Sequence, residues 1–101
     1  MRLTDEQRRV IREAAKELFG PDATVRLFGS RTDDRARGGD IDLLISTSMM
    51  DVNAIVRSEV AFQARVQQEL GEQKLDLLID YPGRGERPPI YRVAEETGVR
   101  L

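Results

Sequence analysis

Two aspartates, Asp40 and Asp42, open an apolar run over residues 40–46 that reads Asp-Ile-Asp-Leu-Leu-Ile-Ser. The run predicts a buried β-strand, and side chains on a strand alternate between its two faces. Both carboxylates are therefore expected on one face, about 6–7 Å apart, where their charges repel. A divalent cation between them would relieve this repulsion, since Mg²⁺ prefers carboxylate and phosphate oxygens. The alternative is a Gly-Gly-Asp turn with Asp42 on a solvated face.

A second apolar run, over residues 23–28, precedes this pair and ends in Gly29-Ser30-Arg31. Nine residues then separate Ser30 from Asp40. A glycine allows a sharp turn and close approach of the backbone to a ligand, while the following serine and arginine offer donors to a phosphate. The pattern is compatible with a phosphate site between the two strands, but taken alone a Gly-Ser pair is more often an ordinary turn at the end of a strand.

A third carboxylate, Asp76, interrupts an apolar strand expected over residues 74–80. If this strand lies beside residues 40–46, Asp76 comes next to Asp40 and Asp42. Three converging carboxylates suit one or two divalent ions, or one ion and a general base. The alternative is that Asp76 faces solvent on an open side of the sheet. Asp80, which ends the same strand before Tyr81-Pro82, is expected to begin a turn.

Three helices are expected around these strands, over residues 4–19, 51–70 and 89–98, with a short final strand at residues 99–101. Thr4 and Gln7 fit a capping box at the first helix. The second helix has apolar positions spread widely enough to serve both the core and a partner, namely Val52, Ile55, Val56, Val60, Ala64, Val66 and Leu70. The third is expected to bury Ile90, Val93 and Ala94. The order predicts one domain over residues 1–101, an α/β fold with a small mixed sheet flanked by helices.

Composition excludes several kinds of chemistry. The chain has no cysteine and no histidine, so thiolate chemistry is absent and any acid–base step must use mainly Asp or Glu. The net charge of −2 argues against broad binding of nucleic acid. No apolar stretch approaches the length of a membrane span, and the first residues lack a signal-peptide pattern, so a cytoplasmic location is expected.

The joint pattern of Gly29-Ser30, nine residues, Asp40-Ile41-Asp42 and a later strand with Asp76 resembles the nucleotidyltransferase superfamily related to DNA polymerase beta. The short chain resembles its minimal nucleotidyltransferase (MNT) branch. The resemblance implies the polymerase beta-like fold, with Gly29 and Ser30 on the β- and γ-phosphates of a nucleoside triphosphate. It implies Mg²⁺ on Asp40, Asp42 and Asp76, and Asp76 as the acceptor of the proton. Arg31, which directly follows Ser30, is a further candidate phosphate contact.

The resemblance also implies a partner. Many MNT proteins are paired with a small helical HEPN protein as antitoxin and toxin, and transfer AMP from ATP to a tyrosine of that protein. This chain is accordingly expected to be an antitoxin-type adenylyltransferase that uses ATP and Mg²⁺, as a homo- or hetero-oligomer. Two alternatives stay open. One is a binding module with the same fold and no turnover, and the other is a nucleotidyltransferase for a small molecule or RNA.

Overall fold

The computed structural model describes residues 3–29 and 40–101 of the chain. Its elements, in chain order, are α1 (Asp5–Phe19), β1 (Thr24–Phe28), β2 (Ile41–Ser46), α2 (Val52–Leu70), β3 (Leu75–Asp80), α3 (Pro89–Thr97) and β4 (Val99–Arg100). The order predicted from the sequence is confirmed. The strands β2 and β3 each begin one residue later than predicted, so Asp40 and Lys74 precede them.

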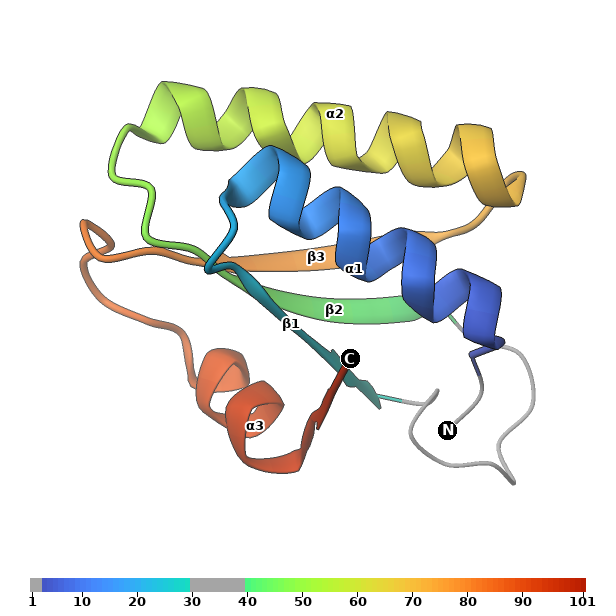
Figure 1. The fold of residues 1–101 in the computed structure, drawn as a ribbon. Coiled ribbons are helices and arrows are strands. Elements are labelled where there is room, and N and C mark those ends of the chain that lie inside the picture. The colour runs from blue at the N-terminus through green and yellow to red at the C-terminus, as the bar shows by residue number, and fades with distance from the viewer. Residues whose placement is uncertain (1–2, 30–39) are drawn as a thin grey trace.

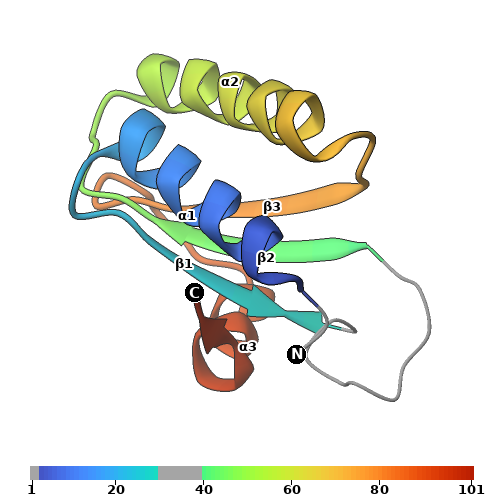
Figure 2. The same cartoon turned by 45° about the vertical axis from the view of Figure 1, so that its right-hand side comes forward.

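The four strands form one mixed sheet in the order β3-β2-β1-β4. The strand β1 runs antiparallel to both β2 and β4, whereas β2 and β3 are parallel and joined through α2. Figures 1 and 2 show α1 and α2 packed side by side on one face of the sheet and α3 on the other. The predicted α/β fold is therefore confirmed. Within the described residues, no helix is long and apolar enough to cross a membrane.

The ends of the helices follow local sequence signals. The side chain of Thr4 accepts a hydrogen bond from the Gln7 amide at 3.0 Å, and the Gln7 side chain accepts one from the Thr4 amide at 2.9 Å. This is the expected capping box. The Asp51 carboxylate accepts hydrogen bonds from the amides of Asn53 and Ala54 at the start of α2. These caps fix the first turns of α1 and α2.

The two faces of the sheet bury different clusters of side chains. On the α1–α2 face, alternate strand residues pack with the helices; those of β1 and β2 are Val25, Leu27, Ile41, Leu43 and Ile45. On the α3 face, Phe28 and Leu44 pack with Tyr91 and Ala94. Because side chains alternate along β2, Asp42 shares the α3 face with Leu44. The fold thus directs the second aspartate away from the larger core.

Only some of the apolar positions predicted for α2 are buried. The buried residues of this helix are Ile55, Phe62 and Val66. Phe62, which the apolar pattern omitted, packs against Phe19 of α1 with ring centroids 6.1 Å apart. The side chains of Val52, Val56, Val60 and Ala64 are exposed instead. A helix has about 3.6 residues per turn, so each step of four residues from Val52 to Ala64 turns further around the helix axis. These side chains therefore lie progressively further from the buried stripe that contains Phe62 and Val66.

The prediction for α3 was also wrong in part. Ala94 is buried as expected, but Ile90 and Val93 are exposed, and Tyr91 is buried in their place. The ring of Tyr91 lies beneath the guanidinium of Arg84, whose Cζ is 4.3 Å from the ring centroid. A tyrosine with an apolar body and a cation over its face is well placed at the border of a small core.

The revised face of α2 can be tested with Phe62→Ala, and with Val60→Ala as the matched control on the same helix. Removing the buried ring should lower the free energy of unfolding by about 3–5 kcal/mol, since a cavity forms beside Phe19. The exposed valine should change it by less than about 0.5 kcal/mol. Urea unfolding followed by circular dichroism measures both. Equal effects would contradict this assignment of the buried face.

Candidate active site

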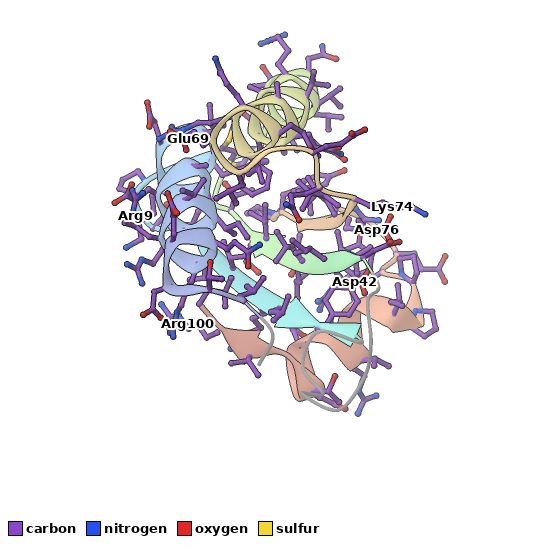
Figure 3. The ribbon with its side chains drawn as sticks, turned by 90° about the vertical axis from the view of Figure 1, so that its right-hand side faces the viewer. Arg9, Asp42, Glu69, Lys74, Asp76 and Arg100 are labelled. Carbon is purple, nitrogen blue, oxygen red and sulfur yellow. The ribbon has the colours of Figure 1, made fainter. Side chains whose placement is uncertain are left out.

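Three adjacent strands, β1, β2 and β3, bring a glycine turn and paired carboxylates to one edge of the sheet. Phe28, the last residue of β1, is the register partner of Asp42, and Asp42 is in turn the register partner of Asp76. Parallel strands start at the same edge, so Asp42 and Asp76 lie next to each other near the amino ends of β2 and β3. Figure 3 shows the two carboxylates side by side at this edge. The predicted neighbourhood of the two strands is confirmed.

The three acids of this site influence one another electrostatically. Burial raises the pKa of Asp42, and three further effects raise it more: the negative charge of Asp76, a hydrogen bond between the two side chains, and the charge of Asp40. Asp42 is half-buried, whereas Asp76 is exposed. Each of these effects disfavours full ionisation of the pair, so either a proton or a bound cation would stabilise it.

Asp40 stands at the margin of this pair. Its carboxylate Oδ2 lies 3.7 Å from the ammonium Nζ of Lys74. The backbone is also joined here, because the amide of Ile41 donates a 2.9 Å hydrogen bond to the carbonyl of Lys74. The acid is close enough for its charge to act on Asp42. All three predicted carboxylates thus lie in one region, with Asp42 and Asp76 as the closer pair.

Gly29 is the part of the predicted phosphate turn that the structure describes. Its φ of +76° lies in the region that L-residues with a side chain rarely adopt. A Cβ at this position would overlap Oδ2 of Asp42 and lie 3.1 Å from Cγ of Asp42. The missing side chain thus permits both the turn and the close approach of Asp42. Ser30 and Arg31, the other predicted phosphate contacts, lie outside the described residues.

The carboxylate oxygens of Asp42 and Asp76 are of the kind that binds a hard divalent cation. Carboxylate oxygens are the usual protein ligands of Mg²⁺, and the adjacent Asp42 and Asp76 offer such oxygens. In the described parts of the chain, however, no three acidic, histidine or cysteine side chains are already grouped so that they could hold a metal ion. The assignment of Asp40, Asp42 and Asp76 as metal ligands stays a prediction.

Arg84 and Arg87, in the loop between β3 and α3, lie away from this site. Arg87 pairs with Asp80 at 3.3 Å and with Glu95 at 3.2 Å, while Arg84 donates a 3.2 Å hydrogen bond to the carbonyl of Ile79. The contacts with Asp80 and Ile79 are at the carboxyl end of β3, away from Asp76 at its amino end, and Glu95 lies on α3. These arginines hold the loop before α3 to the sheet.

Sequence reasoning missed one residue of the site, Lys74. The residue was assigned only as the start of a strand, yet its ammonium is paired with Asp40. The signal was available in its position two residues before Asp76, since strand alternation places such residues on the same face.

Comparison with known proteins bears on this arrangement. A family model described as a nucleotidyltransferase domain matches residues 8–100. A search of curated proteins found no match. The match spans all the strands and the three aspartates at the edge of the sheet.

Two variants, Gly29→Ala and Gly71→Ala, separate the contact of Gly29 with Asp42 from the backbone strain of a positive φ. Both glycines have similar positive φ values, +76° and +80°, but a Cβ at Gly71 would meet nothing within 4 Å. Each substitution should therefore destabilise the protein by about 1–3 kcal/mol through strain. Only Gly29→Ala should also displace Asp42, which a carbon NMR titration of its carboxyl would detect. An unchanged titration of Asp42 in Gly29→Ala would contradict the proposed close approach.

The raised pKa of Asp42 predicts a specific pH dependence. A carboxyl whose pKa is higher in the folded state binds its proton more tightly there, so its contribution to stability is lost as pH rises from its ordinary value of 3.8 through the raised value. Asp42→Asn should therefore have a higher Tm than the wild type at pH 7 without metal. The difference should shrink as the pH is lowered through this window.

Thermal unfolding between pH 3 and 7 in the presence of a chelator measures this effect. Asp80→Asn is the control on the neighbouring strand, because Asp80 has a partner in Arg87 and its neutralisation should lower the Tm at pH 7. A lower Tm for Asp42→Asn at pH 7 would contradict the electrostatic assignment.

Proposed function

Because the chain belongs to the nucleotidyltransferase domain family, we propose that it transfers AMP from ATP to a hydroxyl group and releases pyrophosphate. The observation that carries the proposal is the pairing of Asp42 with Asp76 beside the Gly29 turn. A glycine turn suits the phosphates of a nucleotide, and paired acids suit a divalent cation and proton transfer. These features lie on three adjacent strands within the matched residues.

The proposed reaction needs only ATP, the acceptor hydroxyl and a carboxylate of this chain that accepts the proton. The acceptor hydroxyl oxygen attacks the α-phosphorus of ATP, the bond to the pyrophosphate oxygen breaks, and the hydroxyl proton passes to the carboxylate of Asp76. Asp76 suits this role because it is exposed, so an acceptor can reach it, whereas Asp42 is half-buried. Proton transfer by a positioned carboxylate contributes on the order of 10²–10⁴ in rate.

Mg²⁺ is the metal proposed for the site. Asp42 and Asp76 would hold it, with Asp40 once its carboxylate leaves Lys74. When bound, the ion supplies positive charge that offsets the charge of the phosphates. The backbone at Gly29 and the neighbouring Ser30 and Arg31 are the proposed contacts of the triphosphate.

The proposed acceptor is a tyrosine of a helical HEPN-type protein, for which this chain would be the antitoxin. The two tyrosines of the chain are poorly placed as acceptors. Tyr91 is buried, and Tyr81 follows the far end of β3, about 16 Å of strand from Asp76. An acceptor tyrosine on a second protein is consistent with this placement.

Exposed apolar side chains support a protein partner. Met50, Val52, Val56 and Val60 are between 52 and 71% exposed and follow one another along the start of α2. Apolar side chains grouped on a surface are typical of protein interfaces. The exposed valines of α2 are thus available for contact with a partner.

The transfer can be tested by co-expressing the chain with the protein of the neighbouring reading frame, if that protein is small and helical. With ATP and Mg²⁺, mass spectrometry should find one added AMP on a tyrosine of the partner. Asp42→Asn and Asp76→Asn should each reduce the rate of labelling by about 10²-fold or more.

Asp80→Asn is the matched control, because Asp80 lies on the same strand at the opposite end. This variant should label the partner at nearly the wild-type rate. Undiminished labelling in Asp42→Asn would contradict the catalytic assignment. A tight complex without any labelling or nucleotide binding would show a binding module instead.

A further inference from the structure

Lys74 is a cation at the edge of an acidic site. Its ammonium lies 3.7 Å from Asp40, and its carbonyl accepts a hydrogen bond from the amide of Ile41. The backbone of Lys74 is thereby fixed beside the start of β2. Figure 3 shows Lys74 with Asp76 and Asp42 at the same end of the sheet, while Arg9 and Arg100 lie on the opposite side of the view.

The ion pair of Lys74 has little structural value. The side chain of Lys74 is 79% exposed, so solvent screens its attraction to Asp40. Exposed pairs of this kind contribute little to stability, because holding a long side chain in place costs conformational entropy. The backbone of Lys74 is therefore fixed, while the ammonium at the end of its side chain can exchange Asp40 for another partner.

The charge of the site indicates what that partner would be. Three ionised carboxylates and one ammonium leave a formal charge of −2, which one divalent cation balances. A cation that takes Asp40 as a ligand would displace Lys74 from it. A triphosphate that then binds brings further negative charge to the site. Among the ion pairs of the described residues, the one between Lys74 and Asp40 places a positive side chain beside these acids, whereas Arg87 pairs with Asp80 and Glu95 elsewhere.

We propose that Lys74 is a phosphate-binding residue that exchanges its pair with Asp40 for a charge-assisted contact with the triphosphate of the nucleotide. This inference rests on the proposed function and adds a specific ligand contact to it. Before the nucleotide binds, Lys74 neutralises Asp40. Afterwards, its ammonium contacts an anionic phosphate oxygen, as lysines at phosphate sites do.

The chain has a matched control for this residue. Lys16, in the last turn of α1, is its only other lysine and is also exposed. Calorimetry with ATP, GTP, CTP and UTP in Mg²⁺ should show nucleotide binding by the wild type and by Lys16→Met. In Lys74→Met the affinity should fall by roughly tenfold or more, and Lys74→Arg should retain most of it. Binding of Mg²⁺ alone should not weaken in Lys74→Met, because a competing cation is removed from Asp40.

A second measurement needs no variant. Acetylation of the wild-type chain with an amine-reactive reagent, followed by mass spectrometry, reports each lysine separately. The nucleotide with Mg²⁺ should slow acetylation of Lys74 by roughly tenfold, relative to Lys16 in the same sample. Mg²⁺ alone should give no such protection.

The outcomes separate this inference from the proposed function. If the wild type binds nucleotide, but Lys74→Met binds it equally well and Lys74 is not protected, the role of Lys74 is overturned and the proposed function stands. If the wild type binds none of the four nucleotides, the proposed function and the ligand of Lys74 are both overturned.

Discussion

The parallel pairing of β2 with β3 is the constraint on which the site depends. The register sets Asp42 opposite Asp76, and α2 supplies the crossover that parallel strands require. Packing of α2 through Phe62 against Phe19 therefore helps to hold the two carboxylates together. A shift of one residue in this pairing would move Asp76 to the opposite face of β3, since strand side chains alternate.

The strands were predictable from the sequence because their apolar runs are short, continuous and bounded by turn residues. The buried faces of α2 and α3 were not. Apolar periodicity cannot distinguish a valine that packs from one that is left exposed, so Phe62 and Tyr91 were missed, Ile90 was misplaced, and the valines of α2 could not be divided between core and surface. The choice depends on the partner surface, which in α2 is the side of α1 that carries Phe19.

The site was predictable to a similar degree. Strand alternation and the Asp-x-Asp spacing correctly brought Asp42 and Asp76 together, and the glycine turn was correctly placed beside them. The ion pair of Lys74 was missed because a long side chain reaches its partner through space, and its choice of Asp40 depends on the register of two strands. The convergence of Ser30 with these acids stays a prediction.

The central claim is that Asp42 and Asp76 form the cation site. Titration of the isotope-labelled chain with Mn²⁺, followed by NMR line broadening, tests it most directly. The account predicts that signals of Asp42 and Asp76 and their strand neighbours broaden first, and that Asp42→Asn abolishes this selectivity. Broadening centred on other acids, such as Glu95 and Glu96 on α3, or unchanged in Asp42→Asn, would contradict it.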